Sequence, residues 1–134
     1  MITATSIRNV HKYDVQMNTL SIRRVECVNL LESHGKNADV FRITLKDGEN
    51  IVDLQTSQIT GSAYFTNVNG TTTTISGTVY TEANGSYIEF KLPQTCYGTK
   101  GRCEIVFVLE MENGIITTTD YENRAVMIIT GNVL

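Results

Sequence analysis

The sequence contains no tryptophan, one proline, two histidines and three cysteines among its 134 residues. A single proline excludes a proline-rich linker protein. No run of about 18 apolar residues is present, and residues 1–10 are too polar to form the apolar core of a signal peptide. We therefore expect synthesis in the cytoplasm and no membrane partner.

An excess of basic charge is also missing. Lysine and arginine number 11 against 14 aspartates and glutamates, which gives a formal net charge of −3. A nucleic-acid-binding domain usually presents a basic face, so we expect no nucleic acid partner. The hydrophobic content of 41% and the charged content of 19% are ordinary for one globular domain of this length.

The three cysteines, Cys27, Cys96 and Cys103, are an odd number. Buried free thiols are the preferred interpretation in a reducing compartment. Cys96 and Cys103 flank a short loop, so a disulfide across a hairpin is the alternative. No Cys-x-x-Cys pair is present, and we expect no metal site.

Nucleophilic catalysis needs a nucleophile, a base and an orienting group within reach of one another. His11 and His34 are the only histidines, and both lie in polar stretches without a Gly-x-Ser-x-Gly motif. The carboxylates fall mostly at outward strand positions or in turns. We therefore expect neither catalytic residues nor a cofactor, and predict that the protein is not an enzyme.

Four Asx-Gly dipeptides divide the sequence: Asp47-Gly48, Asn69-Gly70, Asn84-Gly85 and Asn113-Gly114. A two-residue type I′ turn needs positive φ at both central positions, and Asn-Gly or Asp-Gly adopts this conformation most easily. The dipeptides therefore predict antiparallel β-hairpins.

Between the turns, apolar and polar residues alternate with a period of two. Residues 40–46, 59–66, 87–92 and 103–111 each place apolar side chains on one face. Residues 20–31 also fit a helix, but their valine, isoleucine and cysteine content favours a strand.

These patterns predict an all-β fold, an immunoglobulin-like antiparallel β-sandwich of about seven to nine strands. Residues 1–12 carry no clear period and are interpreted as an N-terminal arm. Residues 13–134 then form a single β-sandwich domain, which ends in an apolar tail over residues 131–134.

Several segments follow one another in an order typical of a known family. The sequences FRITLKDG (residues 41–48), NGSYIEFKLP (84–93) and NGIITT (113–118) are the main ones. In these features the chain resembles the N-terminal immunoglobulin-like domain of tailed-phage baseplate upper proteins. It differs at residues 67–70, where that family often has a Pro-Asp-Gly turn, and it stops at Leu134.

The resemblance implies a bacteriophage virion structural protein. A chain of this length suits a head fibre or decoration protein, or a tail or baseplate accessory component. The implied partners are other virion proteins (capsid, portal, tail or baseplate) and further copies of the chain in a homo-oligomer, with the virion as its location. Four residues are candidates for subunit contacts: Val106, Val108, Val133 and Leu134.

A carbohydrate- or host-surface-binding β-sandwich module is the alternative function. Sugar sites favour exposed aromatic rings that have hydrogen-bonding neighbours. Four tyrosines are predicted at outward or loop positions: Tyr64, Tyr80, Tyr87 and Tyr97. Packing between neighbouring strands is the competing explanation for these rings.

Overall fold

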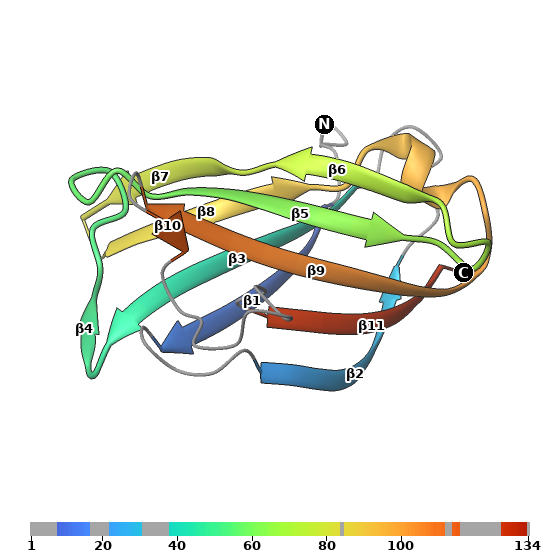
Figure 1. The fold of residues 1–134 in the computed structure, drawn as a ribbon, viewed down its shortest axis with the longest axis horizontal. Coiled ribbons are helices and arrows are strands. Elements are labelled where there is room, and N and C mark those ends of the chain that lie inside the picture. Colours follow the sequence, from blue (N-terminus) through green and yellow to red (C-terminus); the bar gives the residue numbers. More distant parts are fainter. Residues whose placement is uncertain are drawn as a thin grey trace, which may run out of the picture.

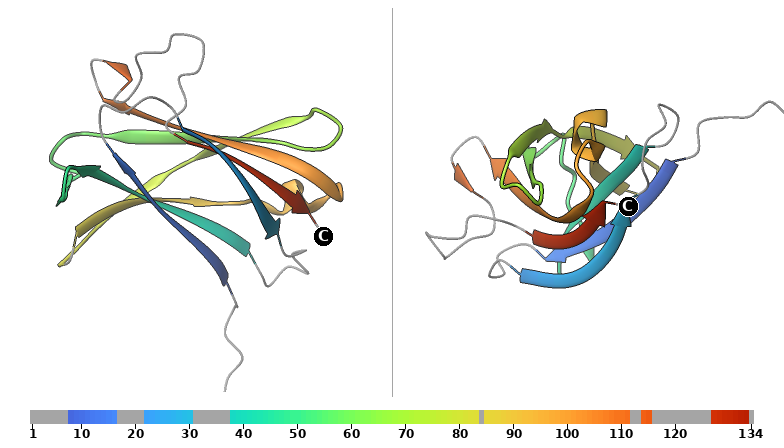
Figure 2. Two further views of the ribbon diagram at one scale, coloured as in Figure 1. Left: turned by 90° about the horizontal axis from the view of Figure 1, so that it is seen from below. Right: turned by 90° about the vertical axis from the view of Figure 1, so that its right-hand side faces the viewer.

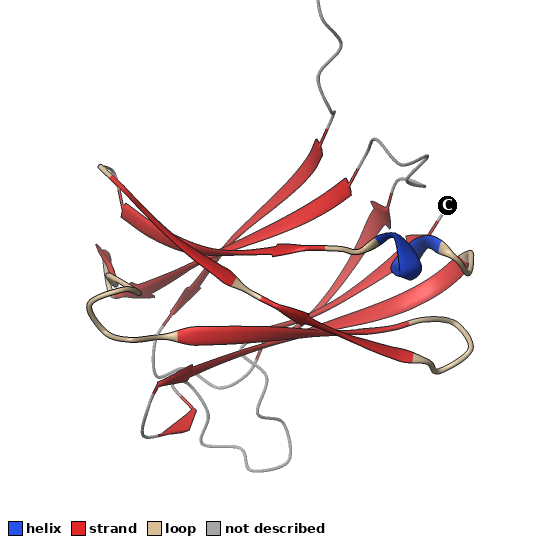
Figure 3. Ribbon diagram, turned by 90° about the horizontal axis from the view of Figure 1, so that it is seen from above, coloured by secondary structure: helices blue, strands red, loops and turns tan. Residues whose placement is uncertain are grey.

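The fold is known from a computed structural model, which describes residues 8–16, 22–30, 38–83, 85–111, 114–115 and 127–133. In this part of the chain two β-sheets pack face to face (Figures 1 and 2). One short 3-10 helix, η1 (Gln94–Tyr97), lies between β8 and β9 and is blue in Figure 3.

We name the two layers sheet A and sheet B. Sheet A has the order β1 (Arg8–Gln16), β3 (Ala38–Asp47), β8 (Gly85–Lys91), β7 (Thr78–Glu82), with β4 (Asn50–Ile51) also paired to β3. Sheet B has the order β2 (Ile22–Leu30), β11 (Met127–Val133), β9 (Gly101–Met111), β5 (Thr60–Thr66), β6 (Thr72–Ser76), with β10 (Gly114–Ile115) paired to β9.

This strand order is immunoglobulin-like. The order β3-β8-β7 corresponds to strands B, E and D of an immunoglobulin domain, and β11-β9-β5-β6 corresponds to the sheet that contains strands G, F and C. Nine of the described strands have five residues or more. The predicted fold class is confirmed, and so is the strand interpretation of residues 20–31, which contain β2.

Two strand pairs differ from the antiparallel prediction. β1 pairs with β3 in parallel, and β2 pairs with β11 in parallel. Neighbouring parallel strands need a long crossover connection between them. Here β2 belongs to that crossover, because the chain passes from β1 in sheet A to β2 in sheet B and back to β3.

The two ends of the described chain also differ from the prediction. β1 begins at Arg8, so the strand takes up the last five positions of the predicted arm over residues 1–12. Residues 131–133 are not a free tail, because they complete β11 between β2 and β9. Hydrogen bonds to β2 and β9 hold this segment in sheet B. The sequence alone shows only a short apolar stretch near the end of the chain.

The predicted hairpins form, but two of their turns differ from the prediction. The register pairs Asp47 with Asn50, so the two-residue loop lies one position after the Asp47-Gly48 dipeptide. Gly48 has a φ of 64°, whereas Asp47 does not have positive φ. Glycine at the first loop position is typical of a type II′ turn rather than type I′. Thr66 pairs with Thr72, so five residues rather than two join β5 to β6 around Asn69-Gly70. The turns predicted at Asn84-Gly85 and Asn113-Gly114 include residues outside the described part of the chain.

The core lies between the sheets and is built from the predicted inward faces. Phe107 of β9 contacts both Phe41 of β3 and Phe90 of β8, with ring centroids 5.5 and 5.2 Å apart. Burying aromatic rings of this size contributes strongly to stability. The other fully buried side chains include Ile43, Leu45, Leu54, Phe65, Ile88, Ile105 and Leu109.

The chain changes from sheet B to sheet A at Gly77, between β6 and β7, which follow one another along the upper edge in Figure 1. The Gly77 N–H donates a hydrogen bond to the Gly61 carbonyl at 2.9 Å. A Cβ atom at Gly77 would lie only 2.6 Å from Ile88 Cδ1. A residue with a side chain would therefore clash with Ile88 at the point where the chain passes from one sheet to the other.

Candidate functional site

The four candidate tyrosines do not form one surface. Tyr80 and Tyr87 lie on the outer face of sheet A, whereas Tyr64 lies on β5 of sheet B. Tyr97 is buried in η1, which corrects its predicted outward position. A single platform of four tyrosines is therefore excluded by the fold.

Tyr80 and Tyr87 are direct neighbours across β7 and β8. Their rings stack with centroids 5.5 Å apart, and the Arg42 guanidinium carbon lies 4.9 Å from the centroid of the Tyr87 ring. The Tyr87 hydroxyl donates to the Glu82 carboxylate at 3.0 Å. Partial burial and this hydrogen bond both raise the pKa of Tyr87. The expected packing between strands thus accounts for this pair.

A hollow of about 210 Å³ lies beside this stack on the outer face, and we call it the sheet A hollow. Arg42 at its edge donates through Nε to Glu89, whose side chain is 4% exposed. Asp14 forms an ion pair with Lys46 at 3.3 Å. Six residues line the hollow: Lys12, Asp14, Arg42, Thr44, Glu82 and Tyr87.

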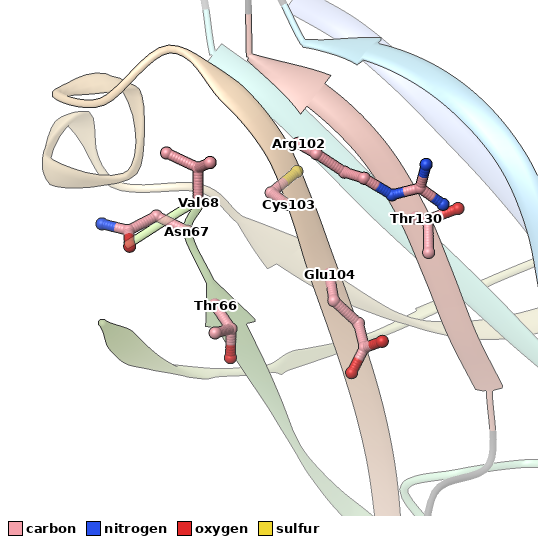
Figure 4. Close-up of a pocket in the computed structure, with 7 residues that line it drawn as sticks. All are labelled: Thr66, Asn67, Val68, Arg102, Cys103, Glu104 and Thr130. Carbon is pink, nitrogen blue, oxygen red and sulfur yellow. The ribbon is translucent and has the colours of Figure 1, made fainter. Parts of the chain in front are cut away.

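A second hollow, of about 430 Å³, opens at one end of sheet B. Figure 4 shows Asn67 and Val68 on one side and Arg102 and Thr130 on the other. The Asn67 side chain accepts hydrogen bonds from the backbone N–H groups of Asn69 and Thr71, which holds this wall in place. The remaining lining residues are Thr66, Cys103 and Glu104.

The structure separates the four candidate contact residues. Val106 and Val108 are half-buried on the outer face of sheet B, opposite Tyr64 and Ser62 of β5. Val133 is 3% exposed and belongs to a strand that is paired on both edges, so it offers no free edge to a neighbour. Leu134 lies outside the described residues.

A buried polar cluster, which is not among the sites expected from the sequence, joins β1, β3 and η1. Asp39 is fully buried, and its two carboxyl oxygens lie 2.8 Å from His11 Nε2 and 2.8 Å from the Tyr97 hydroxyl. The Asp39 backbone N–H donates to the same hydroxyl at 2.7 Å. Burial is the main cause that raises the pKa of Tyr97. Because Asp39 and Tyr97 are 58 positions apart, no spacing pattern indicates the contact.

Cys96 and Cys103 are free, buried cysteines, as the preferred interpretation predicted. Burial raises the pKa of each thiol to about 11. Both thiols are therefore protonated at neutral pH, and a protonated thiol is a poor nucleophile. Cys27 lies on β2, whose side chains are outside the described part of the structure.

The described residues form neither a metal-binding cluster nor a membrane-spanning helix. No group of three or more histidine, cysteine, aspartate or glutamate residues among them gathers into a metal-binding cluster. Within the same residues, no helix has both the length and the apolar character needed to cross a membrane.

Comparison with known proteins gives a likeness in structure but none in sequence. No protein-family model matches the chain, and no curated protein matches its sequence. Among solved structures, the N-terminal domain of phage TP901-1 ORF48 is similar with a TM-score of 0.54 and 10% sequence identity. The match covers 92% of this chain and 96% of that chain. It shows a shared fold, while membership of the baseplate upper protein family stays a prediction.

Proposed function

We propose that the protein is a structural component of a bacteriophage virion that acts through contacts with other protein subunits. The observation that carries this proposal is the likeness to a phage domain along nearly the whole length of both chains. Within the virion, a head fibre or decoration protein, or a tail or baseplate accessory component, is the role that we assign to a domain of this size.

The experiment for this role is mass spectrometry of purified particles from the virus that encodes the chain. We expect the protein in the particles in several copies, at a ratio to the major capsid protein that repeated purification does not change. Its presence in infected cells but absence from the particles would overturn the proposal.

The outer face of sheet B is the surface that we assign to contacts between copies of the chain. Val106 and Val108 supply half-buried apolar area at the middle of β9, next to Tyr64, which is 36% exposed. Arg102 and Glu110, both exposed, lie on the same face at opposite ends of β9. If two copies pack with antiparallel β9 strands, Arg102 of each copy comes opposite Glu110 of the other.

Light scattering tests this contact. We expect the wild-type protein to form a dimer or a larger symmetric assembly, and Val106→Asp to weaken association at least tenfold, because a carboxylate would be buried without a partner. Thr78→Asp adds the same charge at an exposed position of sheet A and should leave the mass unchanged.

Charge exchange tests the arrangement of the two copies. Arg102→Glu alone should weaken association, and Arg102→Glu combined with Glu110→Arg should restore it, because the pair is then reversed rather than removed. A wild-type protein that is monomeric at every concentration would overturn the contact without touching the proposed virion role.

A further inference from the structure

Two cations lie next to each other at the sheet A hollow. Lys12 of β1 is the direct register partner of Arg42 of β3, and both line the hollow. Like charges directly opposite each other on neighbouring strands are destabilising. No hydrogen bond or ion pair links Lys12 to another residue in the described part of the chain. Glu89 offsets part of the Arg42 charge, and an anion bound between Lys12 and Arg42 would relieve the repulsion that remains.

The Arg42 guanidinium is held in place before any ligand arrives. Its Nε donates to Glu89, and the Tyr87 ring lies against its face. Arginine has five N–H donors, so the two terminal nitrogens keep donors that can reach a carboxylate. A donor that is already oriented loses little conformational entropy on binding.

The lining of the hollow also contains hydrogen-bond acceptors. Asp14 and Glu82 line it together with Thr44. Ionised carboxylates accept hydrogen bonds and cannot donate them, so they suit a ligand that bears hydroxyl groups. They also repel a second negative charge, which disfavours a chain of carboxylates or phosphates. The volume, about 210 Å³, is below the 300–1,000 Å³ that is usual for drug-sized ligands.

We propose that the sheet A hollow binds one sugar-acid unit, a monosaccharide ring that carries a single carboxylate. The carboxylate lies between Lys12 and Arg42, and ring hydroxyls donate to Asp14 and Glu82. The binding is weak, with a dissociation constant on the order of 1 mM, because the hollow is small and its charges are partly screened by water. This site is independent of the proposed virion role.

The test is a titration of the 15N-labelled protein with sodium glucuronate, followed by heteronuclear NMR. We expect saturable shifts confined to the amides of β1, β3 and β8 around the hollow. Glucose, which lacks the carboxylate, and acetate, which lacks the hydroxyls, should each bind at least tenfold more weakly. Higher salt concentration should weaken the glucuronate complex.

Lys12→Gln is the main variant, because Lys12 is exposed and its replacement should leave the fold intact. We expect it to weaken glucuronate binding at least fivefold. Lys91→Gln removes a cation from an exposed position of β8 that does not line the hollow, and it should bind as the wild type does.

Three results would overturn the proposal. The first is the absence of saturable shifts with glucuronate. The second is equal binding of acetate, which would reduce the site to a nonspecific contact with carboxylates. The third is tighter binding of an acidic peptide than of glucuronate, which would assign the hollow to a protein partner.

Discussion

The Tyr97 side chain is a hydrogen-bond partner of two buried polar groups of Asp39, and no pattern in the sequence indicates this contact. The Tyr97 hydroxyl accepts from the Asp39 backbone N–H and donates to the Asp39 carboxyl group, so one oxygen atom serves two buried polar groups. A buried polar group that loses its partner keeps its full desolvation penalty. The hydroxyl therefore matters more to stability than one ordinary hydrogen bond.

Replacing Tyr97 with phenylalanine tests this dependence. We expect Tyr97→Phe to lower the free energy of unfolding by about 1–3 kcal/mol, because both Asp39 groups lose this partner. Urea denaturation measures the change. Tyr64→Phe removes a hydroxyl at an exposed position and should change stability by less than about 0.5 kcal/mol. Equal losses in the two variants would contradict the account.

Because of the buried thiols, the free energy of unfolding decreases as the pH becomes alkaline. Burial raises the pKa of Cys96 and Cys103 to about 11 in the folded state, above that of an unfolded thiol. The unfolded state therefore loses these protons first as pH rises. The contribution of each thiol is fully present below about pH 8.5 and is lost as pH rises through about 11.

We expect this loss to reach about 3 kcal/mol per thiol, because a pKa change of one unit corresponds to about 1.4 kcal/mol. Urea denaturation at several pH values between 8 and 11 gives the slope of stability against pH. The double variant Cys96→Ala, Cys103→Ala should have a shallower slope than the wild type, whatever its stability at neutral pH. Identical slopes would show that the two thiols do not titrate differently in the folded and unfolded states.

At the scale of single elements, the link between β6 and β7 is the most constrained. A Cβ atom at Gly77 would lie 2.6 and 2.7 Å from side-chain atoms of Ile88 and 2.8 Å from the Phe90 ring. Both neighbours are fully buried core residues, so neither can move away freely. The chain can therefore pass from sheet B to sheet A at Gly77 only because the missing side chain leaves room for Ile88 and Phe90 of β8.

Gly77→Ala should lower the free energy of unfolding by about 1–3 kcal/mol through overpacking. Thermal or urea denaturation measures the loss. Gly98→Ala is the matched control, because Gly98 has a φ of −68° and its added Cβ would meet only one atom, at 3.5 Å. If both variants lost the same stability, close packing at Gly77 would not be the cause.

The strands show which features of an element a sequence predicts well. The inward faces of β3, β8 and β9 agree with the alternation, because side chains of a strand point to opposite faces by geometry alone. The turns are less well predicted. Asx-Gly marks a hairpin, but pairing of the flanking strands decides which residues form the loop.

At the scale of the whole molecule, most strand pairs join distant parts of the sequence. β3 pairs with β8, β5 with β9, and β2 with β11, and each pair encloses dozens of residues. Loop-closure entropy must be overcome before such contacts stabilise the chain. The fold therefore places the protein among slowly folding β-sandwiches.

We expect refolding in water at 25 °C to take milliseconds to seconds. Stopped-flow tyrosine fluorescence after dilution from urea measures the rate, since the chain has six tyrosines and no tryptophan. A main phase of microseconds would contradict the prediction, because it would require mostly local contacts.

The sequence by itself determined the all-β class, the positions of the hairpins and the inward face of the main strands. These features are local: a turn or an alternating strand is specified by residues that are close together in the chain. Only the tertiary structure decided the parallel pairing of β1 with β3 and of β2 with β11, the burial of Tyr97 against Asp39, and the pairing of Lys12 with Arg42 across β1 and β3. Each of these joins residues tens of positions apart, and only the packing of the two sheets brings them together.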